Sequence, residues 1–274
     1  MMLSEESISE ILSKENLLTV ESINRSVFNY LKRNTFNNVE VLVKKGALLS
    51  LDVNDLYRKI YEEKRGGYCF EHNKLFYFAL LAKGVDCESH LARVVYGRDV
   101  DIPRTHRIII AQFENKSYLV DVGCGQDTPT KMIPLSGEVV ECHMGIRYRV
   151  QQTSEREYQL EILKPTTPFV LYKFELINCS ESDFDIGNYY SNTHPQSKHT
   201  TNLVMSRFTE EESFILINGI FIKKGKKDKQ ESELQNKEEL FEICKKYFDI
   251  KLSEDESVKL FDFILKKRAR ESHA

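Results

Sequence analysis

Apolar residues in the first third of the chain recur at the spacing of an amphipathic helix. One such series begins behind Thr19, and a similar pattern runs from Asp52 to Tyr61, with Asp52 as a candidate N-cap. Both patterns predict helices with one apolar side turned toward a core. The first series consists of Ile23, Val27, Tyr30 and Leu31.

A longer helix is predicted from about Cys69 to Lys83. Its apolar residues are numerous enough to bury it on most sides, and Gly84 is a natural C-terminal stop. These residues are Leu75, Phe76, Phe78, Ala79, Leu80 and Leu81.

After Gly84 the pattern changes to short β-rich stretches separated by polar turns such as 114–116 and 154–156. This spacing predicts antiparallel hairpins that close a small barrel or sandwich. A further hairpin joins 213–217 to 220–224 through Asn218-Gly219, a strong two-residue turn signal. The other expected strands span 90–96, 106–113, 117–122, 148–152, 158–163 and 169–176.

The end of the chain returns to helix, first over 238–248 and then behind a capping box formed by Ser253 and Glu256. Helices are thus followed by strands and then by a mixed α/β segment, which predicts an α+β fold. The sequence has no internal repeats.

Composition narrows the function classes. A chain of 274 residues with 41% hydrophobic side chains can bury a substantial core. Its 39 basic and 42 acidic residues nearly balance, so we expect no nucleic-acid partner. The lysine-rich run 223–229 is either a solvated hairpin end or a contact for a ligand phosphate.

The chain shows no membrane or secretion signal. The longest apolar run, 76–82, is too short for a bilayer, and residues 1–6 lack a signal-peptide pattern. The six cysteines form no Cys-x-x-Cys pair and have no nearby histidine at zinc spacing. We therefore expect free thiols, no metal and a cytoplasmic location.

The chemically informative segment is 65–73, Arg-Gly-Gly-Tyr-Cys-Phe-Glu-His-Asn. Its two glycines free the backbone to turn sharply, which puts Cys69 in the first turn of the buried helix. A helix N-terminus favours negative charge, and therefore the thiolate needed for nucleophilic attack. The alternative interpretation is an inert core cysteine.

A cysteine nucleophile needs an imidazole to accept its proton and a carboxylate to orient that imidazole. His106 opens one expected strand and Asp121 closes the next, and the turn near Asn115 brings both to the same end of a hairpin. Asp121 also interrupts an apolar strand, so it requires a partner if it is buried. Otherwise, His106 is a surface residue and Asp121 a turn residue.

Segment 65–73 closely resembles the nucleophile motif of the arylamine N-acetyltransferase family, whose triad is Cys, His, Asp in that order. Three later segments, 105–110, 120–125 and 192–200, are similar to its histidine, aspartate and substrate-cleft segments. The resemblance implies an N-terminal helical bundle over 1–84, a central antiparallel β-barrel over 85–190 and a C-terminal α/β lid over 191–274, with a cysteine-protease-like core.

The resemblance also implies a two-step reaction. Cys69 would take an acetyl group from acetyl-coenzyme A and pass it to an arylamine or hydrazine, with His106 and Asp121 completing the triad, in xenobiotic metabolism. It implies Thr105, Cys124 and Gly125 as coenzyme A contacts, and Phe70 and His199 as substrate contacts.

Several positions depart from the family pattern. Val39 and Val41 flank Glu40 where the family shows Pro-Phe-Glu-Asn-Leu, and Cys124 and His199 replace aromatic residues. Two alternatives to acetyl transfer stay open. One is a cysteine-triad hydrolase or amide synthase, which differs in the fate of the acyl group. The other is a binding protein with a reshaped cleft, which would bind coenzyme A or arylamines but transfer little.

Overall fold

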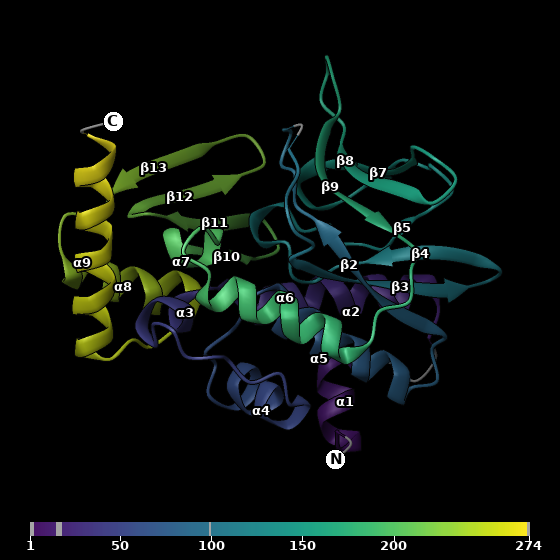
Figure 1. The fold of residues 1–274 in the computed structure, drawn as a ribbon, viewed down its shortest axis with the longest axis horizontal. Coiled ribbons are helices and arrows are strands. Elements are labelled where there is room, and N and C mark those ends of the chain that lie inside the picture. Colours follow the sequence, from purple (N-terminus) through teal and green to yellow (C-terminus); the bar gives the residue numbers. More distant parts are fainter. Residues whose placement is uncertain (1–2, 15–17, 99, 273–274) are drawn as a thin grey trace.

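The computed structural model describes residues 3–14, 18–98 and 100–272. Figure 1 shows two β-structures side by side, with helices packed beneath and at one end. The helices are α1 (Glu5–Ile11), α2 (Val20–Arg33), α3 (Val39–Val43), α4 (Val53–Tyr57), α5 (Cys69–Ala82), α6 (Glu181–Thr193), α7 (Lys198–Thr201), α8 (Lys237–Phe248) and α9 (Glu254–Glu271).

The larger β-structure is an antiparallel sheet in the order β5-β4-β3-β2-β9-β8-β7-β6. β5 also contacts β7, which brings the two ends of the sheet together into a nearly closed barrel. The predicted central barrel is thereby confirmed. Its strands are β2 (Cys87–Arg93), β3 (His106–Phe113), β4 (Lys116–Val120), β5 (Ile133–Pro134), β6 (Val140–Glu141), β7 (Arg147–Gln152), β8 (Glu157–Ile162) and β9 (Phe169–Glu175).

The second sheet has the order β1-β10-β11-β12-β13 and is antiparallel throughout. Its Asn218-Gly219 hairpin is confirmed, since both residues have positive φ and join adjacent paired strands. The run 223–229 forms the far end of the next hairpin. The strands are β1 (Phe36–Asn37), β10 (Val204–Phe208), β11 (Glu212–Ile217), β12 (Ile220–Gly225) and β13 (Lys229–Glu233).

Several element boundaries differ from the sequence-based expectation. β2 begins three residues earlier than expected because it already pairs with β3 at Cys87, and it ends three residues early, ahead of Tyr96 and Gly97, whose positive φ turns the chain. The helix expected over 52–61 is α4 followed by one π-helical turn, Arg58–Glu62. Asp52 caps α4 as predicted, accepting from the backbone N–H of Asn54 and Asp55.

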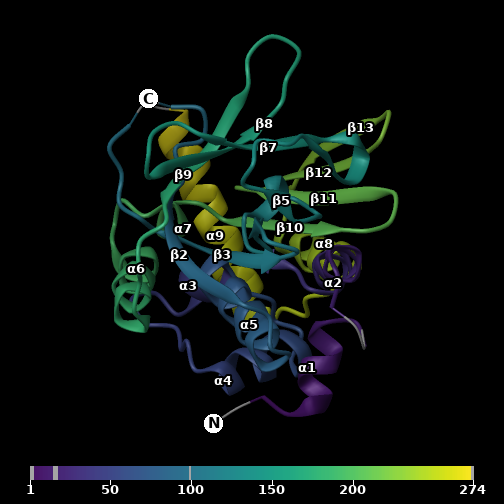
Figure 2. The same cartoon turned by 90° about the vertical axis from the view of Figure 1, so that its right-hand side faces the viewer.

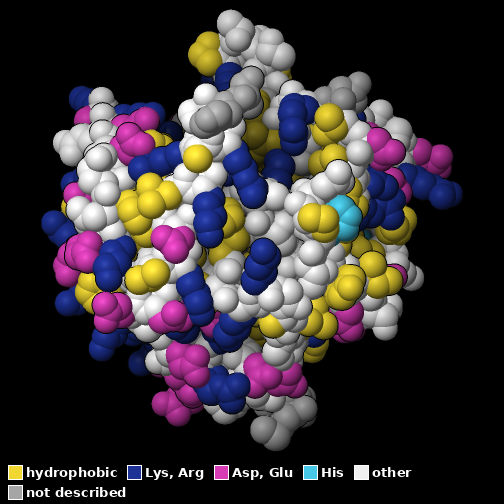
Figure 3. Space-filling model, turned by 60° about the vertical axis from the view of Figure 1, so that its left-hand side comes forward, with side chains coloured by type: hydrophobic (Ala, Val, Ile, Leu, Met, Phe, Trp, Pro, Cys, Tyr) yellow, Lys and Arg dark blue, Asp and Glu magenta, His cyan; other side chains and the backbone are white. Residues whose placement is uncertain are grey.

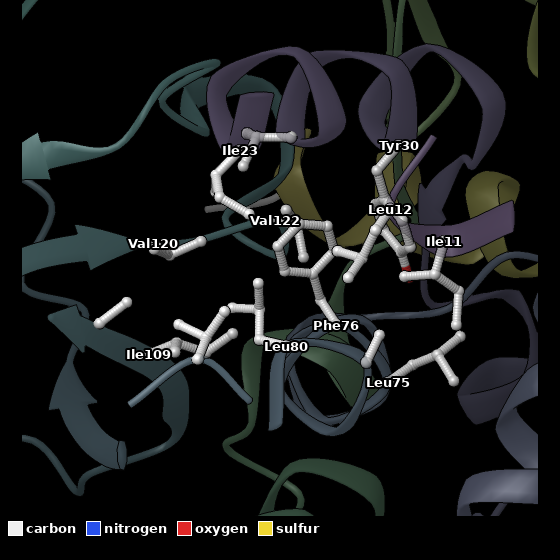
Figure 4. Packing of buried hydrophobic residues seen from close by; sticks show 14 of the residues in the cluster. Ile11, Leu12, Ile23, Tyr30, Leu75, Phe76, Leu80, Ile109, Val120 and Val122 are labelled. Carbon is white, nitrogen blue, oxygen red and sulfur yellow. The ribbon is translucent and has the colours of Figure 1, made fainter. Parts of the chain in front are cut away.

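The core beneath the barrel forms where α1, α2 and α5 pack against β3 and the end of β4 (Figure 4). Phe76 lies at its centre and is completely buried, so its replacement by Ala would cost about 3–5 kcal/mol. This packing fixes α5 against the barrel. Around Phe76 lie Ile11, Leu12, Ile23, Tyr30, Leu75, Leu80, Ile109, Val120 and Val122.

Figure 2 shows the β7–β8 hairpin standing away from the helical layer, with α8 and α9 beside the second sheet. The face in Figure 3 carries basic and acidic side chains together, with acidic groups gathered toward its margins. Within the described ranges, no helix is both long and apolar enough to traverse a bilayer.

Candidate active site

Cys69 is the first residue of α5, so it lies where the backbone N–H groups of a helix lack internal partners. The preceding turn requires glycine. Gly66 has φ of +61°, and a Cβ there would lie 2.1 Å from the carbonyl oxygen of Thr35. Glu71 holds the helix start by accepting from the N–H of Tyr68 at 3.0 Å. The Cys69 side chain is 3% exposed.

His106 and Asp121 meet at the same end of the β3–β4 hairpin, as their spacing predicts. His106 Nε2 and Asp121 Oδ2 are 2.7 Å apart, and both side chains are buried. β4 ends at Val120, before the predicted end at 122, and Asp121 then turns the chain by accepting from the N–H of Gly123 at 2.8 Å. Both residues of the predicted pair are therefore partnered.

The pair adjoins Cys69. A Cβ on Gly123 would lie only 2.8 Å from Cys69 Cα, so this glycine allows the end of β4 to touch the start of α5. Burial opposes protonation of His106, but the charge and hydrogen bond of Asp121 and a hydrogen bond with Cys69 raise its pKa to about 10. An imidazolium beside the thiol is the charge that stabilises a thiolate.

Asp121 stays ionised in this setting. Burial alone would raise its pKa, but the charge and hydrogen bond of His106, with donation from Asn73, keep the pKa below its usual value. Asn73 donates to Asp121 Oδ1 at 2.8 Å, and Tyr172 donates to Oδ2 at 3.0 Å. The carboxylate is thus fixed from both sides.

The sequence places Asn73 in the 65–73 motif without giving it a role, and it does not indicate Tyr172. Asn73 lies one turn after Cys69, within the four consecutive polar residues 71–74 of α5, and it also donates to the carbonyl of Arg107 and accepts from the N–H of Val122. Its position one turn after Cys69 is the signal that the sequence offers for it. No comparable local signal marks Tyr172, which comes from β9.

The other five cysteines are less suited to nucleophilic attack. All six are free. Burial raises the pKa of each of the other five thiols, which keeps them protonated. The five are Cys87, Cys124, Cys142, Cys179 and Cys244.

Two of the predicted coenzyme A contacts border the triad. The carbonyl oxygen of Thr105 lies 3.6 Å from Cys69 Sγ. Cys124 has its sulfur near His106 and Asp121, with ligand atoms of all three within 4.8 Å of one another. Metal ligands could be arranged in this way, but Asp121 already accepts four hydrogen bonds and is satisfied without a cation. Gly125 instead faces the ring of Phe36.

The two predicted substrate contacts differ in position. Phe70 is completely buried, and its ring lies so close to Gly187 of α6 that a Cβ there would be 2.5 Å away. The ring of His199, in α7, lies 5.0 Å from that of Tyr68. Burial, followed by the charges of His106 and Lys198, lowers the pKa of His199 to about 4, so its ring is neutral at pH 7.

The departures at Val39 and Val41 are accommodated by apolar packing. Val39 belongs to the core of the C-terminal segment, and Val41 packs with Tyr68 and Cys69. Glu40, between them, keeps an ion pair with Lys59 at 3.1 Å.

The sequence profile of the N-acetyltransferase family matches residues 19–257. The chain is 32% identical over 173 residues to the arylamine N-acetyltransferase of Escherichia coli, which covers 63% of this chain and 60% of that protein. A Mycobacterium tuberculosis arylamine N-acetyltransferase is also 32% identical, over 60% of this chain and 61% of its own length. These alignments therefore span about three fifths of the curated relatives.

Solved structures of relatives match the fold over almost the whole of this chain. The arylamine N-acetyltransferase of Salmonella typhimurium superposes with a TM-score of 0.86 at 25% identity, covering 97% of this chain and 100% of that one. The Mycobacterium marinum arylamine N-acetyltransferase in complex with CoA has the same fold, with a TM-score of 0.83 at 24% identity over 94% of this chain and 98% of that one. Since the family profile covers most of the sequence, the chain belongs to the arylamine N-acetyltransferase family.

Proposed function

We propose that this protein transfers an acetyl group from acetyl-coenzyme A to an arylamine or hydrazine nitrogen through a thioester on Cys69. The observation that carries the proposal is the 2.7 Å His106–Asp121 pair beside a cysteine at the start of a buried helix. Nucleophile, base and orienting group then occupy the relationship that cysteine-dependent acyl transfer requires.

In the first half-reaction, His106 holds the proton of Cys69, and the thiolate attacks the acetyl carbonyl carbon. The new bond joins Cys69 Sγ to that carbon, and the bond between the carbon and the coenzyme A sulfur breaks. His106 returns its proton to the departing coenzyme A thiolate. Asp121 stabilises the imidazolium throughout and remains ionised.

In the second half-reaction, the amine nitrogen attacks the acetyl carbon of the Cys69 thioester. His106 accepts the proton that the nitrogen loses, and Cys69 departs as a thiolate, which restores the starting ion pair. In both halves, the backbone N–H groups in the first turn of α5 are suited to the negative charge that develops on the carbonyl oxygen. The low exposure of Cys69 limits the access of water to the thioester.

The proposed donor contacts are Thr105, Cys124 and Gly125, and the proposed acceptor contacts are Phe70 and His199. Support is strongest for Thr105 and Cys124, which border the triad, and for His199, whose ring is neutral and close to that of Tyr68. We also propose a division at 84/85, between α5 and β2, and one at 190/191, which falls within the last turn of α6. A cytoplasmic location is proposed in keeping with six free thiols.

Intact-protein mass spectrometry tests the proposal. The native chain and Cys69→Ser would each be exposed briefly to acetyl-coenzyme A, with and without an aminobenzoate. The transferase requires an acetyl adduct on the native chain that disappears when amine is added and acetylated amine forms. Loss of the adduct without amine would indicate a hydrolase. No adduct on the native chain would contradict the proposal and favour a binding protein or another acyl donor.

A further inference from the structure

A cavity of about 170 Å³ lies behind the segment that leads to Cys69. Its walls come from five places: the end of α2, the π-helical turn after α4, the turn that precedes α5, strand β10 and the end of α8. Its polar lining includes Arg33, Asn34, Tyr61, Lys64, Arg207 and Asp249. The proposed acetyl transfer uses none of them.

Two buried polar atoms in the cavity wall have no hydrogen-bond partner among the described residues, Asn34 Nδ2 and the hydroxyl of Tyr61. Their residues are 6% and 5% exposed. Burial raises the pKa of Tyr61, and although a hydrogen-bonding contact with the Asn34 side chain opposes the shift, the hydroxyl stays protonated. That contact falls short of hydrogen-bond geometry and leaves the hydroxyl proton and an amide proton free to donate, which costs folding free energy while no acceptor is present.

The charged groups around the cavity are mainly cationic. Arg33 lies 3.4 Å from Glu10, and Lys64 lies 3.2 Å from Asp249. Arg207 uses Nε to donate to the carbonyl of Lys32, but its terminal nitrogens have no hydrogen-bond partner in the described part of the chain. Burial lowers the pKa of this half-buried guanidinium, and the charge of Asp249 only partly opposes that.

We infer that this cavity binds a small oxyanion, held by Arg207 and Lys64 and by hydrogen bonds from Asn34 and Tyr61. Unpaired N–H and O–H donors beside a guanidinium match the acceptor oxygens of a phosphate, sulfate or carboxylate group. The volume admits one such group or several waters. Inorganic phosphate is the simplest probe.

Occupancy would stabilise the turn that precedes the nucleophile. Gly66 also lines the cavity, and its neighbour Arg65 donates to Glu256 at 2.5 Å on α9. An anion that bridges Lys64 and Arg207 would tie this turn to β10. The site is separate from the triad, so its existence does not depend on whether acetyl transfer occurs.

The test is titration of the full chain with inorganic phosphate at constant ionic strength, with chloride as the comparison salt. Calorimetry gives Kd, and the unfolding midpoint gives the stabilisation. Tyr61→Phe should leave the phosphate-free midpoint nearly unchanged, because the hydroxyl it removes makes no hydrogen bond of full geometry with the described residues. Tyr61→Phe, Lys64→Gln and Arg207→Gln should each weaken phosphate binding by about tenfold or more.

Arg156→Gln is the matched control, since Arg156 is an exposed arginine in the loop of the β7–β8 hairpin. It should bind phosphate as the native chain does. Equal effects of phosphate and chloride would mean that the cavity holds only water, and would overturn the inference. So would a phosphate Kd that is unchanged in both Tyr61→Phe and Lys64→Gln.

Discussion

Both carboxylate oxygens of Asp121 accept two hydrogen bonds. Asn73 and the N–H of Gly123 donate to Oδ1, while His106 and Tyr172 donate to Oδ2. Hydrogen bonds to the ionised form favour ionisation even where burial opposes it. The ionised state of Asp121, which orients His106, therefore depends on residues from α5, β3, the turn after β4 and β9.

Replacing Asp121 by Asn should reverse the protonation preference of His106. Burial is the first influence on that ring, and without the carboxylate charge it should bring the pKa below the ordinary 6.5. The amide would also leave Cys69 without a charged partner at neutral pH. NMR titration of the imidazole measures the pKa, and the rate of Cys69 acetylation should fall by about 100-fold or more.

Tyr172→Phe is the matched control because it removes one donor to Asp121 and keeps the carboxylate. His106 should then retain a raised pKa. A folded Asp121→Asn protein in which His106 still titrates near 10 would show that Asp121 does not hold the imidazolium.

At the scale of elements, the start of α5 is held by a buried ion-pair network. Glu71, 1% exposed, accepts from the N–H of Tyr68 with one oxygen and from Lys59 Nζ, at 2.5 Å, with the other. Glu40 of α3 also contacts Lys59. Lys59 of the π-helical turn thus joins Glu71, at the nucleophile turn, to Glu40 of α3.

Glu71→Ala should destabilise the protein by about 3 kcal/mol, because it leaves a buried ammonium with one partner fewer and uncaps α5. Urea denaturation measures the free energy of unfolding. The comparison is Glu254→Ala, which removes an exposed ion pair with Lys237 and should stay within about 0.5 kcal/mol. Equal losses in the two variants would contradict a structural role for Glu71.

The sequence predicts the elements whose signals lie within a few residues of one another. The helix α5, the β3–β4 and β11–β12 hairpins, and the caps at Asp52 and Ser253 follow from apolar periodicity and turn residues. β1 could not be predicted, since it has two residues and is held by pairing with distant segments, chiefly with β10, nearly 170 positions later. The same holds for Tyr172, whose contact with Asp121 spans 51 positions.

At the scale of the whole molecule, the candidate site lies where separate segments converge. α5 provides Cys69, the barrel provides His106 and Asp121, and α7 places His199 beside Tyr68. Arg65 extends the connection to Glu256 of α9, a carboxylate that also caps that helix at Ser253. The contacts that join α5 to the barrel are therefore also the contacts of the site. The free energy of unfolding should for this reason depend on whether His106 is charged.

This coupling predicts how stability depends on pH. The pKa of His106 is about 10 in the folded protein against an ordinary 6.5, so the folded state binds the proton more tightly. Its contribution is complete below pH 6.5, declines as pH rises between 6.5 and about 10, and is absent above that interval. Urea denaturation at one-unit pH steps should show this decline in the free energy of unfolding.

His106→Gln provides the reference, because an amide side chain does not titrate and every other ionisable group is retained. The difference in free energy of unfolding between the native chain and the variant should shrink steadily from pH 6.5 to 10. A difference that stays constant over that interval would mean that the folded state does not raise the pKa of His106. The imidazolium would then be absent at neutral pH, and His106 would begin the acetyl transfer as a neutral base that takes the Cys69 proton only during attack.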